Sequence, residues 1–206
     1  KGTKDQMNYM VRNLRKEFPD YAVVNINYRL ASPQSPAYPK QIEDITAVMA
    51  LLKNKQKEYG LSGEYAFVGS SAGAHLALLY SYGYDKDKSV KVVCSMIGPV
   101  DFTDRSYTSN PKFGSGMLKN LVGIANTYEN NPQLYEKVSP AWNVSAASPP
   151  TIMFHGADDP LVPKTQGPIL KKKLDKFGIA NELYIYDGEK HGKWNDENSK
   201  DIRQKM

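Results

Sequence analysis

A serine between two glycines is the first candidate for chemistry in this sequence. Residues 69–73 read Gly-Ser-Ser-Ala-Gly, a G-x-S-x-G pattern between an apolar stretch and an Ala/Leu-rich stretch. Where a strand turns sharply into a helix, this pattern makes the oxygen of the central serine, here Ser71, project from the sheet as a nucleophile. Gly69 and Gly73 would let the strand and helix backbones approach, because neither carries a side chain. The residues also fit an ordinary glycine- and serine-rich turn, and Ser70 is not at the nucleophile position.

A serine hydroxyl needs a base to take its proton, and the sequence offers three histidines. His75 lies four residues after Ser71 on the same expected helix and would point away from the turn, so we expect it to pack or to cap. His155 ends an apolar stretch, and we expect it to hold the loop that follows. His191 lies in a polar loop after another apolar stretch, and such a loop can reach an active site. We therefore predict that His191 is the base.

The imidazole in turn needs a carboxylate to orient it. Asp158 and Asp159 are adjacent in the loop that follows His155. One of them can accept the Nδ1–H of an imidazole and stabilise the imidazolium that forms during reaction. We expect the other to be solvated or to cap the loop. Asp101 is a lesser candidate, and Asp187 is a weaker one.

Strand-like and helix-like stretches alternate along the chain and would position these groups. Apolar and β-branched runs predict five strands, at residues 21–28, 64–68, 90–97, 151–155 and 181–186. Helical spacing predicts helices at residues 7–18, 42–59, 72–82, 168–177 and from about 195 onward. Strands separated by helices imply a parallel sheet covered on both faces, and chemistry gathers at the carboxyl ends of such strands.

Residues 103–148 show no regular strand or helix pattern, and this segment is too long for a plain connection in a compact α/β fold. We expect two short helices there and an insertion that shapes a binding site. Tyr107 and Tyr128 within it would suit a sugar or aromatic ester if they formed walls of that site. Tyrosines scattered on the surface explain them equally well.

The composition is that of an ordinary globular chain and excludes several classes of protein. The 206 residues are 40% hydrophobic and 24% charged, without a repeat, a linker or an apolar run that could span a membrane. Cys94 is the single cysteine, so neither an internal disulfide nor a cysteine-based metal cluster can form. The net charge of +5 is spread out, and Lys171–Lys173 fits a solvated helix face better than a nucleic-acid surface. We expect one domain, no nucleic-acid partner and no metal or cofactor; a cytoplasmic and a secreted location both stay open.

Together these motifs resemble the α/β-hydrolase superfamily. The order Ser71, Asp159, His191 is similar to that family's order of nucleophile, acid and histidine. Residues 155–163 resemble its H-G-x-x-D-x-x-V-P loop, and this match selects Asp159 over Asp158. Residues 69–77 and 27–30 resemble segments of bacterial carboxylesterases and acetylxylan-esterase-like enzymes. The resemblance implies a three-layer α/β/α sandwich with a mostly parallel central sheet over residues 1–206.

One departure from the family concerns the oxyanion hole. The family has two or three strands before its first helix, and an H-G-G loop after the last of them gives one oxyanion amide. This sequence contains no H-G-G and opens at the first helix, so only the Ala72 amide is assigned. We expect strands upstream of Lys1 to supply the second donor and to cover an open sheet edge; the alternative is an impaired active site. A chain that begins at Lys1 should then be aggregation-prone or dimeric, and a poor catalyst.

The sequence therefore predicts a serine hydrolase of carboxylic esters, with short-acyl or carbohydrate esters as small-molecule substrates. Ser71 would attack, His191 would take its proton and Asp159 would orient His191. A serine peptidase of the prolyl-oligopeptidase type shares the fold and the triad order, but Ser70 and Ala72 fit the esterase pattern better. A non-catalytic binding or scaffold protein on the same fold is the other alternative, supported by the missing H-G-G loop.

Overall fold

A parallel sheet forms the middle layer of the molecule. The structure is a computed structural model, and it describes every residue except 1, 33, 110–113 and 193. Within the described residues the sheet has four strands in the order in which they occur in the chain: β1 (Tyr65–Ser70), β2 (Val90–Met96), β3 (Thr151–Gly156) and β4 (Asn181–Tyr186). All neighbouring pairs are parallel, so the four carboxyl ends meet at one edge.

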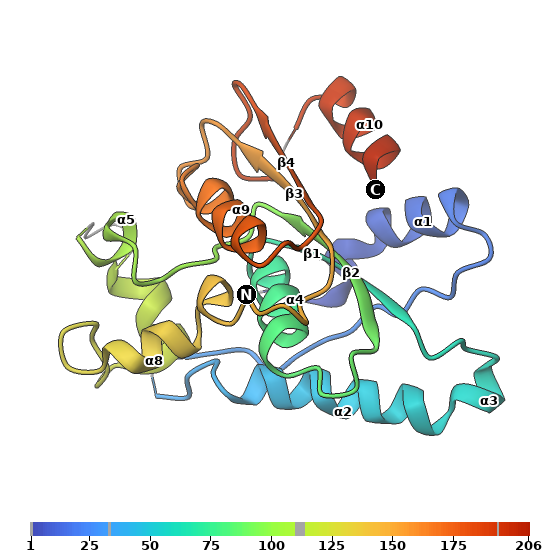
Figure 1. Cartoon of the computed structure of the whole chain (residues 1–206), viewed down its shortest axis with the longest axis horizontal. Helices are drawn as coiled ribbons and strands as arrows, with labels where there is room; N and C mark the ends of the chain where they lie inside the picture. Colours follow the sequence, from blue (N-terminus) through green and yellow to red (C-terminus); the bar gives the residue numbers. More distant parts are fainter. Residues whose placement is uncertain (1, 33, 110–113, 193) are drawn as a thin grey trace.

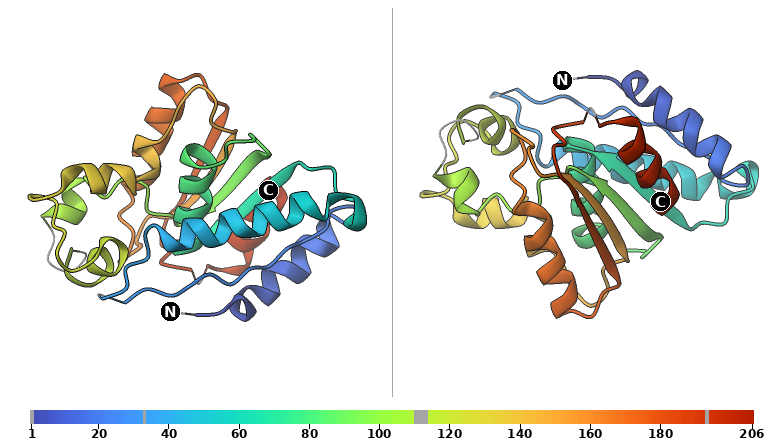
Figure 2. Two further views of the ribbon diagram at one scale, coloured as in Figure 1. Left: turned by 90° about the horizontal axis from the view of Figure 1, so that it is seen from below. Right: turned by 90° about the horizontal axis from the view of Figure 1, so that it is seen from above.

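Helices cover both faces of this sheet. α4 (Ala72–Gly83) and α9 (Gln166–Lys176) lie on one face, and α10 (Asp196–Lys205) lies on the other (Figure 1, Figure 2). Successive strand residues point to opposite faces. Val93 and Met153 therefore join the core beneath α4 and α9, while Cys94 and Phe154 join the core beneath α10. The three-layer α/β/α arrangement predicted from the sequence is confirmed.

The long helix predicted after the proline-rich loop is interrupted near its end. It forms as α2 (Lys40–Asn54) and a further turn, α3 (Gln56–Tyr59), with Lys55 between them. α2 packs against α4 through the stripe Ile42, Ile45, Met49 and Leu52, all buried. No described helix is both long and apolar enough to cross a bilayer.

The first predicted strand, residues 21–28, does not form. No regular secondary structure is present over residues 22–31, although Ile26 and Tyr28 pack against the main core. A strand exists only where a neighbour completes its hydrogen-bond ladder. Among the described residues, β1 pairs with β2 alone, and its other edge has no strand beside it. The prediction from β-branched and aromatic residues was wrong because it could not test for a partner strand.

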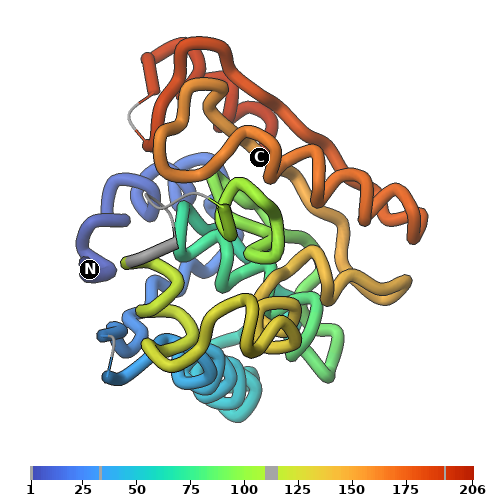
Figure 3. Tube along the Cα trace, turned by 90° about the vertical axis from the view of Figure 1, so that its left-hand side faces the viewer, coloured from blue at the N-terminus to red at the C-terminus, as the bar shows by residue number. Residues whose placement is uncertain are grey.

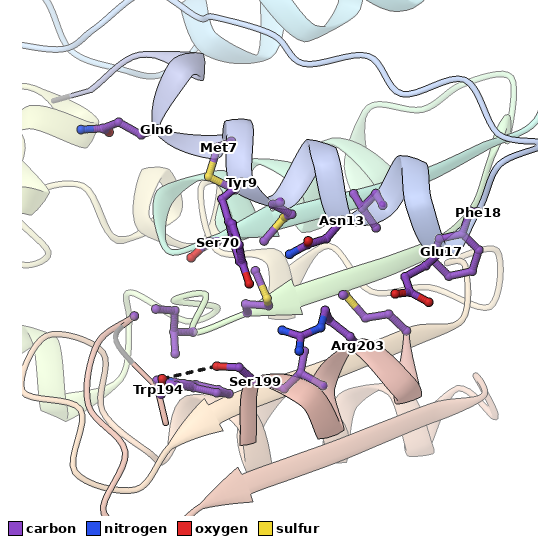
Figure 4. Close-up of a pocket in the computed structure, with 17 residues that line it drawn as sticks. Gln6, Met7, Tyr9, Asn13, Glu17, Phe18, Ser70, Trp194, Ser199 and Arg203 are labelled. Atoms are coloured by element: carbon purple, nitrogen blue, oxygen red, sulfur yellow. Dashed lines mark hydrogen bonds between the residues drawn. The ribbon is translucent and has the colours of Figure 1, made fainter. Parts of the chain in front are cut away.

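The amphipathic helix near the start of the chain forms, but its apolar stripe is only half buried. A short turn, η1 (Lys4–Met7), leads into α1 (Asn8–Glu17), which has no fully buried residue. α1 lies on the same side of the sheet as α10 (Figure 2), and a groove of about 300 Å³ separates the two helices. Met7, Phe18, Ser70 and Arg203 are among the residues that line this groove (Figure 4).

The insertion contains more short helices than predicted and has its own apolar core. Its elements are α5 (Arg105–Thr108), the π-helical turn η2 (Gly114–Leu118), α7 (Lys119–Val122), α8 (Pro132–Lys137) and η3 (Pro140–Trp142). Tyr107 is fully buried in this core, and Tyr128 packs its ring edge-on against Tyr135 at 5.7 Å. Tyr107 therefore forms no open wall for a substrate. The Ala37 N–H donates to Asn120 O at 2.8 Å, which joins the insertion to the segment before α2 (Figure 3).

Candidate active site

Ser71 lies on a strained turn between β1 and α4. Its φ of 52° and ψ of −118° are values that a residue with a side chain rarely adopts. The Ser71 N–H donates to Met96 O at 2.9 Å, which ties this turn to the end of β2. Strain of this kind persists only where the surrounding structure enforces it, and it brings the serine oxygen out at the carboxyl edge of the sheet.

Close backbone contact at the turn depends on Gly69. A Cβ atom at Gly69 would lie 2.4 Å from the carbonyl carbon of Gly73 and 2.6 Å from Ala74 N. A Cβ atom at Gly73 would meet nothing within 4 Å. The expectation that both glycines permit the close approach was therefore right for Gly69 and wrong for Gly73, whose hydrogen faces open space.

His191 connects Ser71 to a carboxylate. Its Nδ1 lies 2.7 Å from Asp159 Oδ2, and its Nε2 lies 2.9 Å from Ser71 Oγ. An ionised carboxylate only accepts hydrogen bonds, so Nδ1 carries the ring proton and donates a hydrogen bond to Asp159. In the neutral imidazole, Nε2 is then the acceptor for the hydroxyl of Ser71. The loop after β4 thus brings the predicted base into hydrogen-bond contact with both predicted partners.

Asp159 is held as an anion in a nearly closed environment. Its side chain is only 1% exposed, and its Oδ1 accepts hydrogen bonds from Leu161 N at 2.7 Å and Val162 N at 2.9 Å. Burial acts to raise the pKa of Asp159, but the hydrogen bonds from His191, Val162 and Leu161 outweigh it and lower the pKa below its ordinary value. The carboxylate is therefore ionised at neutral pH and oriented toward the imidazole.

The other two histidines lie in the core. His75 is buried on α4, where its Nε2 donates to Val138 O at 2.7 Å and its ring meets Phe102 edge-on. This contact anchors the insertion to the helix that carries Ser71, in line with the packing role predicted for His75. His155 is fully buried near the end of β3. Burial lowers the pKa of both imidazoles to about 4, so both are neutral at pH 7.

The remaining candidate residues are not part of this chain of hydrogen bonds. Asp101 accepts hydrogen bonds from Thr103 and from Trp142 Nε1, so its carboxylate is engaged in a turn. Asp158 and Asp187 are exposed. Ser70 lines the groove between α1 and α10, as Figure 4 shows.

One candidate donor for a developing oxyanion lies at the start of α4. Ala72 is exposed and is the first residue of this helix, so its N–H has no acceptor within the helix. It follows Ser71 directly, at the positive end of the helix dipole. This geometry suits the stabilisation of negative charge on a carbonyl oxygen that Ser71 attacks.

Gln166 is a supporting residue that sequence reasoning missed. It is fully buried at the start of α9, and its Oε1 accepts hydrogen bonds from Val100 N and Asp101 N, both at 2.8 Å. It thereby fixes the loop that follows β2. No local sequence signal distinguishes this glutamine from a surface one.

Metal ligands and the single cysteine are further candidates for chemistry among the described residues. There, no group of three or more His, Cys, Asp or Glu side chains is arranged to hold a metal ion. Cys94 is buried, and burial raises the pKa of its thiol to about 12, so the nucleophilic thiolate is scarce at neutral pH.

Comparison with known proteins places this chain in a family. Residues 1–174 match the BD-FAE family. The chain belongs to the BD-FAE family. The BD-FAE chain is 28% identical over 172 residues to Esterase LipQ of Mycobacterium tuberculosis, covering 78% of this chain and 40% of LipQ. It is 32% identical over 154 residues to the probable carboxylic ester hydrolase LipM of the same organism, covering 69% of this chain and 35% of LipM. The chain thus spans about two fifths or less of the length of these curated relatives.

Solved structures share the fold of this BD-FAE chain. The carboxylesterase EstE1, cloned from a metagenomic library, superposes with a TM-score of 0.77 at 21% identity, covering 98% of this chain and 72% of EstE1. An acetyl ester-xyloside bifunctional hydrolase from Caldicellulosiruptor lactoaceticus superposes with a TM-score of 0.62 at 26% identity, covering 81% and 61% of the two chains. These likenesses confirm the α/β-hydrolase fold that the sequence motifs implied.

Proposed function

We propose that this protein hydrolyses carboxylic esters through an acyl-enzyme intermediate formed on Ser71. The observation that carries the proposal is the unbroken chain of contacts from Ser71 Oγ through His191 to Asp159, with spacings of 2.9 and 2.7 Å. The strained backbone of Ser71 adds support, because an ordinary turn has no need of it. Relatives named as esterases and as a carboxylic ester hydrolase are consistent with the same chemistry.

In this mechanism each residue of the triad has one task. Ser71 Oγ attacks the ester carbonyl carbon while His191 Nε2 takes the hydroxyl proton. Asp159 keeps the proton on Nδ1 and stabilises the imidazolium. The Ala72 N–H donates to the oxyanion of the tetrahedral intermediate. His191 then gives its proton to the leaving alcohol, and a water molecule hydrolyses the acyl-enzyme by the same steps.

We propose short-acyl or carbohydrate esters as substrates. The acetyl ester-xyloside hydrolase from Caldicellulosiruptor lactoaceticus supports this class, as does a truncated carbohydrate esterase from gut microbiota with a TM-score of 0.76 at 22% identity. A panel of p-nitrophenyl esters of increasing acyl length and an acetylated xylo-oligosaccharide would test the class. Activity confined to long acyl chains would contradict it.

Ser71→Ala tests the nucleophile, and Ser70→Ala is its matched control. With p-nitrophenyl acetate, we expect Ser71→Ala to abolish turnover, because among the described residues the hydroxyl hydrogen-bonded to His191 Nε2 is that of Ser71. Ser70→Ala should retain most of the activity, because Ser70 lines the groove between α1 and α10 and has no role in the proposed triad. Loss of turnover in Ser70→Ala alone would overturn the assignment.

A further inference from the structure

A buried carboxylate lies two residues before the proposed base. Glu189 belongs to the loop after β4 and is only 5% exposed. Its Oε1 accepts hydrogen bonds from Asn195 N at 2.9 Å and from Asn198 Nδ2 at 2.7 Å. Burying an ionised carboxylate is costly unless it is well bonded, so a glutamate at this position needs these partners.

The backbone of Glu189 holds two loops of the site together. Its carbonyl oxygen accepts a hydrogen bond from Asp158 N at 3.0 Å, directly beside Asp159. A Cβ atom at Gly156 would lie 2.4 Å from the same carbonyl oxygen, so the end of β3 and the histidine loop are in close contact. The next carbonyl, that of Lys190, accepts from Trp194 Nε1 at 2.7 Å. The loop before His191 is therefore fixed to the acid loop on one side and to the start of α10 on the other.

The charge of Glu189 is balanced by amides rather than by a cation. Among the described residues no lysine or arginine forms an ion pair with it. Its partners are a backbone N–H just before α10 and the amide of Asn198 in the first turn of that helix. The positive end of the α10 dipole favours an anion there. A neutral side chain of the same shape would keep both contacts, because both use a single acceptor oxygen.

We propose that Glu189 is a positioning residue for His191. Its carboxylate fastens the histidine loop to the start of α10, and this attachment keeps Nδ1 directed at Asp159 and Nε2 directed at Ser71. The inference rests on the proposed serine mechanism for its kinetic consequence, whereas its geometric part can be measured on the His191–Asp159 hydrogen bond without any turnover.

Glu189→Ala and Glu189→Gln test this role as a pair. We expect Glu189→Ala to lower kcat for p-nitrophenyl acetate about 10- to 100-fold with KM changed less than about twofold, since displacement of a catalytic group by about 1 Å has effects of this size. Glu189→Gln keeps the acceptor oxygen and should retain kcat within about threefold. The proton NMR resonance of the His191–Asp159 hydrogen bond should persist in Glu189→Gln and be lost or broadened in Glu189→Ala.

Asn198→Ala provides the same test from the other partner if Glu189→Ala does not fold. It removes one of the two carboxylate contacts, and we expect a smaller fall in kcat, again without a change in KM. If the wild type turns over the ester, equal activity of Glu189→Ala and Glu189→Gln would overturn the proposal; an unchanged bridging-proton resonance in Glu189→Ala would overturn it whether or not there is turnover. The resonance is read without turnover, so failure of the positioning claim is distinguishable from failure of the esterase proposal, which would appear as turnover independent of Ser71.

Discussion

Adding one methyl group at Gly69 should disrupt the turn that carries Ser71. In Gly69→Ala the new Cβ would lie 2.4 Å from the backbone carbon of Gly73, whereas carbon atoms in contact are about 3.5–4.0 Å apart. The clash is with backbone atoms, so no side-chain rotation relieves it, and β1 and the start of α4 must separate by about 1 Å. Overpacking of this kind costs about 1–3 kcal/mol of unfolding free energy, and a shift of about 1 Å in a catalytic group costs about 100-fold in rate.

Gly73→Ala is the matched control, four residues along the same motif. Its Cβ would meet nothing within 4 Å, and alanine is favoured over glycine in a helix by about 1 kcal/mol. Urea unfolding followed by circular dichroism, together with kcat for p-nitrophenyl acetate, measures both variants. We expect Gly69→Ala to lose stability and activity and Gly73→Ala to keep or gain stability while remaining active. Wild-type behaviour of Gly69→Ala, or loss of stability only in Gly73→Ala, would show that the close contact at Gly69 does not constrain the turn.

Two further predictions concern charge. Asp159→Asn should lower kcat by about 10³- to 10⁴-fold, because an amide does not hold the required histidine tautomer. Asp158→Asn, at an exposed position, should keep kcat within about twofold of the wild type. Equal losses of kcat in an esterase assay would mean that the two carboxylates share the role. His75 and His155 are buried and neutral, with pKa values lowered by burial from 6.5 to about 4, so the unfolded chain binds more protons than the folded one between these values. The contribution of the two neutral histidines to the free energy of unfolding should be fully present above about pH 7. It should be lost as the pH drops from 6.5 toward 4, by roughly 2 kcal/mol per histidine at pH 5. The urea midpoints of unfolding at pH 8 and pH 5 measure this loss, and His75→Gln and His155→Gln should each make the difference between the two midpoints smaller. A wild-type midpoint that does not fall between pH 8 and pH 5 would contradict the prediction.

Local hydrophobic patterns correctly predicted the strands that have a neighbouring strand to pair with. The runs predicted at residues 90–97 and 151–155 form β2 (Val90–Met96) and β3 (Thr151–Gly156), because continuous apolar residues suit strands covered on both faces. The equally apolar run at 21–28 forms no strand, since a ladder depends on a second backbone that no local pattern reveals. The same limit applies to Tyr107, whose burial follows from the fold of the whole insertion.

The candidate site, too, was predictable from the sequence only in part. Their places after three strands of one parallel sheet predicted that Ser71, His191 and a carboxylate from the loop after β3 meet, because parallel strands bring their carboxyl ends to one edge. The resemblance to the α/β-hydrolase loop was needed to choose Asp159 over Asp158. The supporting residues were not predictable in this way. Glu189 and Gln166 are polar side chains whose burial and bonding arise only when distant segments pack together. The distinction between Gly69 and Gly73 likewise depends on atoms across the turn rather than on the motif.

A fluorophosphonate probe tests whether Ser71 is the nucleophile. The probe forms a covalent bond with a serine that a neighbouring base has activated, and mass spectrometry of the digested protein locates the adduct. We expect a single adduct on Ser71 that is absent in Ser71→Ala, strongly reduced in His191→Ala and retained in Ser70→Ala. An adduct on another serine, or wild-type protein that does not react at all, would contradict the account.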